Sequence, residues 1–156
     1  MSVSAEQAIE RALMLYAWGY DENDMELVAA AFTPDAELVF SPDPVIEDVE
    51  ALGGERRTVG RDAIIAQFRA SRATFDERGE RPWHIVTNTL IESRDEEQAR
   101  VRCCYLFYTQ SASGLRLHGL SRYHDDFVRH DGEWRIRTRR NVVAHLGSRH
   151  AAESGA

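Results

Sequence analysis

The spacing of apolar residues changes at about residue 80, and this change limits the folds that the chain can adopt. Before it, apolar residues recur every three to four positions, which predicts amphipathic helices. After it, apolar and polar residues alternate over long segments, which predicts strands with one buried face. Helices first and long antiparallel strands last are typical of an α+β domain. A strongly bent sheet wrapped around the early helices would enclose a cavity lined by both.

Three helices are expected in the first half of the chain, at residues 4–19, 25–32 and 61–78. Ser4 is a suitable N-cap for the first helix, with Gln7 three positions on as its capping-box partner. The polar cluster that follows this helix should break it, and either Asn23 or Asp24 can cap the second helix.

Four long strands are expected in the second half, at residues 83–92, 99–110, 115–129 and 134–145. A shorter strand at 36–40 precedes an acidic loop at 41–59, whose last three residues are a candidate strand. Loops of this length in a compact domain are commonly functional. We therefore expect one domain over residues 1–156, with its core at about 5–145 and a flexible tail at 147–156.

Composition limits the binding partners and the cellular compartment that can be expected for this chain. The net charge is −7, which argues against nucleic acid or an anionic membrane as a partner. No apolar run approaches the length of a membrane span, and the N-terminus lacks the pattern of a signal peptide. Cys103 and Cys104 are adjacent, where a disulfide would be strained, so they are expected to be small apolar residues in a reducing compartment. These features predict a soluble, cytoplasmic protein.

Residues 82–88, Pro-Trp-His-Ile-Val-Thr-Asn, place two polar side chains in an apolar stretch of strand. Residues an even number apart lie on one face of a strand, so His84 and Asn88 are expected to point the same way, with Val86 between them. Taken alone, this pattern is explained most simply by a core histidine with satisfied hydrogen bonds. A general base in a pocket is the alternative.

Alternation also predicts which side chains of the last two strands share a face. It places Ser121, Tyr123 and Asp125 on one face of the third long strand, and Arg140 on the same face of the last strand as Trp134. Arg140 is then either a wall residue or a contact for an anion. The remaining histidines are expected mostly at the surface: His118, His124, His130 and His145, of which His145 is also a candidate near the pocket.

Four segments together resemble the SnoaL-like group of the nuclear transport factor 2-like (cystatin-like) superfamily. They read YDENDMELVAAAFTPDAEL, GRDAIIAQF, HIVTN and RYHDDFVRHDGEWRI, and the resemblance covers residues 5–145. It implies an α+β cone, in which a strongly bent, mostly antiparallel sheet wraps around three N-terminal helices and encloses a single deep pocket. A homo-oligomer, a dimer or a trimer through the open sheet face, is also expected.

Two lyase families within this group point to the same pair of residues. Scytalone dehydratases carry a Tyr-Asp pair that looks like Tyr20-Asp21, a pocket histidine that resembles His84, and a pocket serine that falls on Ser121. Their pocket asparagine falls on Tyr123, and their second pocket histidine has no counterpart in this sequence. In hexachlorocyclohexane dehydrochlorinases, the catalytic aspartate aligns with Asp21 and the catalytic histidine lies in a His-x-x-Thr-Asn motif, as His84 does here.

The resemblance implies a cofactor-independent lyase, acting on a small cyclic or aromatic molecule, in which Asp21 orients His84 as general base. Water is the expected leaving group, with halide possible on the same dyad. Tyr20 and Tyr16 are candidate proton donors, and no organic cofactor or metal ion is expected. Asn88, Ser121 and Tyr123 are candidate contacts for polar groups of the substrate.

Other interpretations stay open at this point. Asp21 is also a candidate helix cap, although Asp24 is better placed, and Ser121 and Tyr123 are candidate wall residues. Ketosteroid isomerases share the superfamily, and Tyr16, Asp43 and Asp125 lie at loosely comparable positions. A buried Asp125 with a raised pKa would favour that reading, and an Asp125 paired with arginine would count against it. A non-catalytic module, like the β subunits of ring-hydroxylating dioxygenases, would not need an Asp21/His84 pair in a pocket.

Overall fold

The computed structural model describes residues 4–43 and 54–146, the last two through their backbone only. The expected flexible tail at 147–156, and residues 44–53 of the expected loop, lie outside this part of the chain. The helices are α1 (Ala5–Asp21), α2 (Met25–Ala30) and α3 (Arg61–Glu77), and the strands are β1 (Phe32–Pro42), β2 (Arg56–Val59), β3 (Arg81–Arg94), β4 (Gln98–Ser111), β5 (Gly114–His130) and β6 (Glu133–Leu146).

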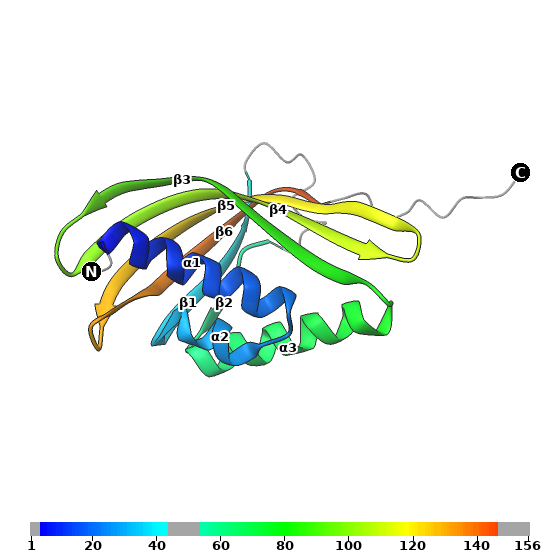
Figure 1. Cartoon of the computed structure of the whole chain (residues 1–156), viewed down its shortest axis with the longest axis horizontal. Coiled ribbons are helices and arrows are strands. Elements are labelled where there is room, and N and C mark those ends of the chain that lie inside the picture. The colour runs from blue at the N-terminus through cyan, green and yellow to red at the C-terminus, as the bar shows by residue number, and fades with distance from the viewer. Residues whose placement is uncertain (1–3, 44–53, 147–156) are drawn as a thin grey trace, which may run out of the picture.

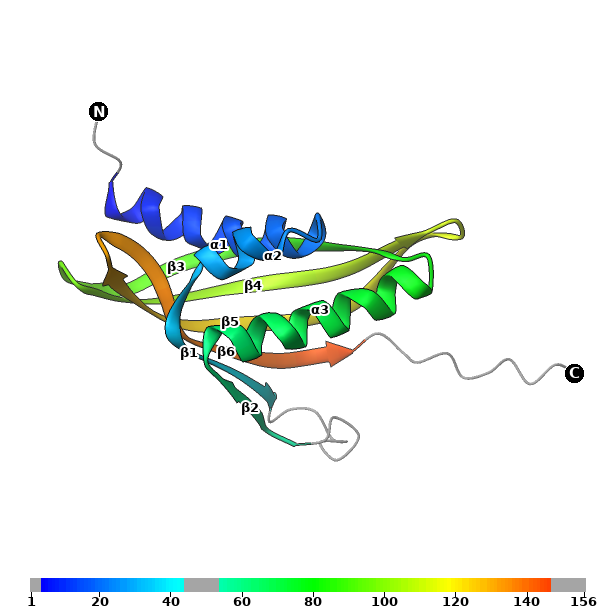
Figure 2. The same cartoon turned by 90° about the horizontal axis from the view of Figure 1, so that it is seen from below.

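The strands form one mixed sheet in the order β2-β1-β6-β5-β4-β3. The pair β1 and β6 is parallel, and the other neighbouring pairs are antiparallel. Figures 1 and 2 show the three helices gathered on one face of this sheet, which arches over them. The predicted α+β architecture, a mostly antiparallel sheet with three helices, is confirmed. No helix within residues 4–43 and 54–146 is long and apolar enough to cross a membrane.

The N-cap residues of α1 and α2 are among the candidates that the sequence predicted. Ser4 and Gln7 form the predicted capping box at the start of α1. Asp24 caps α2, because its Oδ1 accepts the backbone N–H groups of Glu26 and Leu27, each at 3.1 Å. The capping role is therefore filled by Asp24, which leaves the carboxylate of Asp21 available for another contact.

The helix α2 ends earlier than its apolar pattern predicted, at Ala30 in place of residue 32. The backbone N–H of Ile136 donates to the carbonyl of Ala31 at 2.8 Å, and Phe32 pairs with Ile136. Pairing with β6 therefore draws this segment into β1, which begins four residues before the expected start at residue 36. Tertiary pairing has overridden a local helical preference here.

Gly19 permits the close packing of α1 against α2. A Cβ atom at this position would lie 2.8 Å from the carbonyl oxygen of Asp24 and 2.8 Å from the backbone nitrogen of Val28. The absence of a side chain lets the two helices meet, while α1 continues to Asp21. This contact fixes the last turn of α1, which carries Tyr20 and Asp21.

Several bulges interrupt the strict alternation expected of the long strands. Three of them each insert one residue near the site, at about Asn88 in β3, at His118 in β5 and at Arg137 in β6. Past a bulge, each side chain switches to the opposite face of the sheet. In β6 the switch turns Arg139 inward, where it is fully buried, so the expected inward placement of Arg140 is wrong.

Candidate active site

A cavity of about 620 Å³ lies between the concave face of the sheet and the helices α1 and α3. Its lining includes Tyr16 and Tyr20 from α1, Ser71 from α3, His84 from β3 and Tyr105 from β4. The predicted pocket lined by both helices and sheet is therefore present in the described part of the chain. Its volume suits a small organic molecule.

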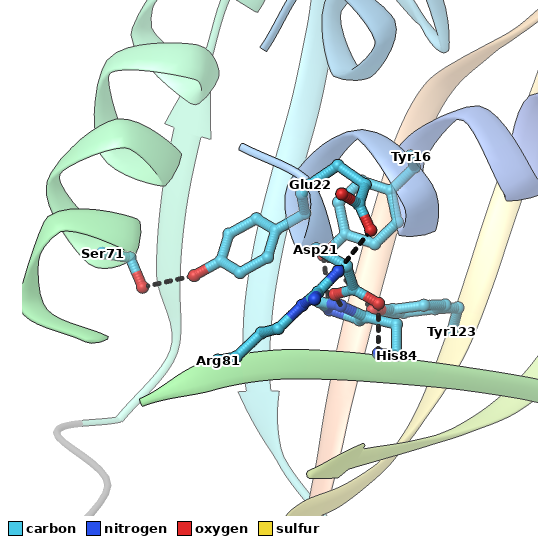
Figure 3. A network of polar contacts seen from close by, with 8 residues as sticks. Tyr16, Asp21, Glu22, Ser71, Arg81, His84 and Tyr123 are labelled. Carbon is cyan, nitrogen blue, oxygen red and sulfur yellow. Dashed lines mark hydrogen bonds and ion pairs between the residues drawn. The ribbon is translucent and has the colours of Figure 1, made fainter. Parts of the chain in front are cut away.

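The carboxylate of Asp21 binds His84 through both of its oxygens (Figure 3). Oδ1 lies 2.7 Å from the ring Nδ1 of His84, and Oδ2 accepts the backbone N–H of the same residue at 2.7 Å. Both side chains are buried, with 8% of the Asp21 side chain and 4% of the His84 side chain exposed. The two contacts fix both the position of the strand and the rotation of the imidazole ring.

The end of α1 is joined to β3 by a second contact, next to the first. Glu22 and Arg81 form an ion pair at 2.5 Å, which Figure 3 shows beside the Asp21–His84 contact. Both partners are about half exposed, so the pair contributes little free energy of its own. It lies on the same two elements as the dyad and supports their alignment.

This arrangement gives the two ring nitrogens of His84 different roles. With Nδ1–H donating to the carboxylate, Nε2 carries the lone pair and is the basic nitrogen. Nε2 lies 3.5 Å from the hydroxyl of Tyr16, at the wall of the cavity. A carboxylate that orients an imidazole and stabilises its protonated form is the arrangement required of a general base.

Tyr16 is supported from behind by a buried polar network. The hydroxyl of Tyr123 donates to the hydroxyl of Tyr16 at 3.3 Å, and the guanidinium of Arg139 lies 4.4 Å from the centre of the Tyr16 ring. Burial raises the pKa of Tyr16, so its phenol keeps its proton. Tyr16 can therefore donate a hydrogen bond toward the cavity or toward His84.

Arg139 is itself held by Asp125. The two side chains form a fully buried ion pair, with an Nη2–Oδ2 distance of 2.6 Å and an Nε–Oδ1 distance of 3.0 Å. The carboxylate raises the pKa of Arg139, which stays charged. Burial raises the pKa of Asp125, while Arg139 opposes this shift. The pairing with arginine counts against Asp125 as the neutral acid of an isomerase-type oxyanion hole.

Tyr20 crosses the cavity wall from α1 to α3. Its hydroxyl lies 2.8 Å from that of Ser71. Burial raises the pKa of Tyr20, so it remains a donor. Ser71 was not predicted as a site residue. Its signal in the sequence was a polar residue on the apolar stripe of α3, between Phe68 and Phe75.

Aromatic rings form a column beneath the dyad. The His84 ring stacks on Tyr105 at 5.5 Å between centroids, and Tyr105 stacks on Tyr123 at 4.4 Å. The guanidinium of Arg139 lies 3.9 Å from the centre of the Tyr123 ring. Stacking and cation–π contacts of this kind hold the rings in place and restrict the motion of His84.

The three predicted substrate contacts on the strands have different surroundings. Ser121 is buried and lines the cavity. Tyr123 is buried behind Tyr16 and Tyr105 and is not among the lining residues. For Asn88, the predicted placement on the face of His84 is wrong. Its φ of 54° lies in the bulge of β3, its side chain is exposed, and it does not line the cavity.

Two cavity residues were missed because of bulges in their strands. His118 was expected at the surface, but the β5 bulge brings it to the cavity, where its ring lies 5.3 Å from that of Phe107. Burial lowers its pKa. Asn141 follows the bulge in β6 and lines the cavity with 4% of its surface exposed. The side chain of His145 lies outside the described residues.

Most of the chain, residues 1–140, matches the family model described as the SnoaL-like domain. Among curated proteins, no sequence matches this chain.

Solved structures share the fold over nearly the full chain. A protein from Novosphingobium aromaticivorans, named as a candidate scytalone dehydratase, is 25% identical with a TM-score of 0.69, over 97% of this chain and 94% of that one. ActVI-ORFA from Streptomyces coelicolor is 20% identical with a TM-score of 0.71, over 92% of this chain and 97% of that one. The β subunit of a candidate aromatic-ring-hydroxylating dioxygenase, also from Novosphingobium aromaticivorans, is 15% identical with a TM-score of 0.70, over 92% of this chain and 91% of that one.

Proposed function

This chain belongs to the SnoaL-like domain family, as its sequence segments predicted, and on that premise we propose that it is a cofactor-independent lyase. Its substrate is a small cyclic or aromatic molecule, and its reaction is the elimination of water. The observation that carries the proposal is the Asp21–His84 dyad, whose histidine lines a cavity of about 620 Å³. Such a dyad supplies acid–base chemistry without a metal ion or an organic cofactor.

The reaction begins with removal of a proton. His84 Nε2 takes the proton from a carbon next to a carbonyl group, and the electron pair of that C–H bond moves toward the carbonyl oxygen. Asp21 stabilises the imidazolium that forms, because its carboxylate accepts the Nδ1–H at 2.7 Å. The hydroxyls of Tyr16 and Tyr20, both protonated and both at the cavity, donate to the oxygen on which negative charge develops.

Departure of the hydroxyl group completes the elimination. The electron pair returns to form the carbon–carbon double bond, the C–O bond of the neighbouring carbon breaks, and the hydroxyl leaves as water with the proton held by His84. The base is then neutral again. A halide leaving from the same carbon would follow the same course, with the proton released to solvent in place of water formation.

Two other functions are less well supported. An isomerase of the ketosteroid type needs a neutral acid, and the pairing of Asp125 with Arg139 counts against it at that position. A purely structural subunit, as the likeness to a dioxygenase β subunit would suggest, does not need a buried dyad that opens on a cavity. The distance of 2.7 Å between Asp21 and His84 therefore favours the enzyme.

The proposal is tested with a cyclic β-hydroxy ketone that aromatises on loss of water. β-Hydroxytetralone gives a naphthol, whose ultraviolet absorbance reports turnover directly. The protein is dialysed against EDTA and assayed with no added cofactor. A matched β-chloro ketone identifies the preferred leaving group. Turnover of the hydroxy compound well above the rate in buffer is expected, and no acceleration of either compound would overturn the proposal.

A further inference from the structure

Asn141 brings a polar group to the cavity wall that the dyad does not use. It lies on β6, is buried and lines the cavity. Its Nδ2 donates to the hydroxyl of Tyr105 at 3.1 Å. Its Oδ1 is buried and has no hydrogen-bond partner among the residues that the structure describes. Buried polar atoms in native proteins nearly always have a partner, so an amide oxygen without one, at the wall of a cavity, points to a ligand.

Tyr105 completes this polar group. Because its hydroxyl oxygen accepts from Asn141, the hydroxyl proton is not used in that bond. The pair thus presents one acceptor, Oδ1, next to one donor, the Tyr105 O–H. If the amide is turned about, Oδ1 accepts from Tyr105 and Nδ2 becomes the donor, so one donor and one acceptor remain.

A hydroxyl group is the neutral function that matches such a pair, because it both donates and accepts. A carboxylate would place acceptor oxygens against Oδ1, and an ammonium group would leave the Tyr105 donor unmatched. We propose that Asn141 and Tyr105 bind a hydroxyl on the ring of the substrate, at a ring position other than the carbon that loses its proton. This inference rests on the proposed function only in taking His84 as the reacting end of the cavity.

The sheet sets the size of the molecule that can reach both ends. Two strands, β4 and β5, lie between β3, which carries His84, and β6, which carries Asn141. Three steps between neighbouring strands amount to about 14 Å along the sheet. The concave face brings the side chains closer than that. Tyr105 shortens the distance further, because its ring lies 5.5 Å from the His84 ring and its hydroxyl reaches Asn141, so a molecule of one or two rings can contact both His84 and Asn141.

Binding of compounds that cannot react tests the hydroxyl site independently of the proposed elimination. β-Naphthol, β-methoxynaphthalene and naphthalene have no β-hydroxy ketone, so they bind without turnover. Isothermal titration calorimetry gives their dissociation constants for the wild type. We expect β-naphthol to bind about tenfold or more tightly than β-methoxynaphthalene, because the ether cannot donate to Asn141. Equal affinities, or no binding of any of the three compounds, would overturn the inference.

Variants assign the preference to the two residues. Asn141→Leu has a similar volume and should bring the ratio of the two affinities close to one, while naphthalene binds as well as before or better. If that variant fails to fold, Tyr105→Phe carries the test, because it keeps the stacked ring and removes only the hydroxyl. Its affinity for β-naphthol should fall severalfold, with naphthalene unchanged. A ratio that survives the substitutions would contradict the assignment.

A third variant keeps the two proposals distinguishable. His84→Gln is expected to remove the base and leave the naphthol preference intact. A chain that prefers β-naphthol through Asn141 but eliminates nothing would contradict the lyase alone. A lyase with no such preference would contradict only the hydroxyl site.

Discussion

Asp21 and His84 are 63 positions apart in the sequence, yet both carboxylate oxygens of Asp21 contact the same residue. One oxygen holds the ring through Nδ1 and the other holds the strand through the backbone N–H. The aspartate therefore fixes where the imidazole lies as well as which nitrogen is basic. Its loss should affect stability and catalysis together, and the two effects can be measured separately.

Replacing Asp21 by asparagine tests this double role. The amide keeps one acceptor but turns an N–H₂ group toward either Nδ1–H or the backbone N–H of His84, so one donor loses its partner. We expect a loss of about 1–3 kcal/mol in the free energy of unfolding. We also expect a fall of about 10²–10⁴-fold in kcat. Denaturant unfolding and steady-state kinetics measure the two losses.

Asp24→Asn is the matched control for that variant. It makes the same chemical change three residues away, at the N-cap of α2, where asparagine serves about as well as aspartate. Stability and kcat should both stay close to the wild-type values. If Asp24→Asn were as damaging as Asp21→Asn, the loss would reflect net charge and not the dyad.

The hydrogen bond between Tyr20 and Ser71 separates positioning from chemistry. Ser71→Ala removes the partner and leaves the Tyr20 hydroxyl at the cavity, whereas Tyr20→Phe removes the donor itself. If Tyr20 donates to the reacting oxygen, Tyr20→Phe should lower kcat by at least about tenfold more than Ser71→Ala. Equal losses, with no further loss in the double variant, would make the hydrogen bond a purely structural link between α1 and α3.

The buried pair of Asp125 and Arg139 should dominate the stability of the site. Arg139→Met leaves a fully buried carboxylate without its cation and removes the guanidinium from the Tyr16 and Tyr123 rings. We expect it to lower the free energy of unfolding by about 3–5 kcal/mol. The double variant Asp125→Leu with Arg139→Met should lose much less, since no buried charge remains. Urea unfolding of the two variants decides the matter, and equal losses would argue against this account.

The contact at Gly19 predicts that even a methyl group is harmful there. Gly19→Ala would place its Cβ 2.8 Å from backbone atoms of α2, which cannot move aside as a side chain can. Forcing the helices apart should lower the free energy of unfolding by about 1–3 kcal/mol and reduce kcat, because Asp21 lies two residues on. Adding Val28→Ala removes only the side-chain part of the clash. Full rescue by that second substitution would show that the backbone contacts do not matter.

The helices and long strands were predictable from the local pattern of apolar residues. The Asp21–His84 dyad was predictable from the resemblance to known lyase families. The period of the apolar residues identified each helix and long strand, and the motifs around Tyr20-Asp21 and His84 paired two residues from distant segments. The shift in the end of α2 was not predictable from propensity, because the carbonyl of Ala31 is already bound by Ile136 of β6.

The residues whose facing on a strand was predicted wrongly share one physical cause. A bulge adds a single residue to a strand and reverses the facing of the residues beyond it. This reversal explains Asn88, which faces away from the cavity, and His118 and Asn141, which face it. It also explains why Arg139 and not Arg140 pairs with Asp125. A bulge depends on the neighbouring strand as much as on its own sequence, so alternation alone cannot locate it.

The central claim is that His84 is the base, and its replacement by glutamine tests that claim most directly. Glutamine retains polarity and similar volume but cannot take the proton. The measurement is kcat/KM for β-hydroxytetralone, in the wild type and in His84→Gln, after dialysis against EDTA, with near-ultraviolet circular dichroism to show that the fold is intact. We predict a loss of at least about 10²-fold in a folded variant. A folded His84→Gln variant that keeps the wild-type kcat/KM would contradict the account.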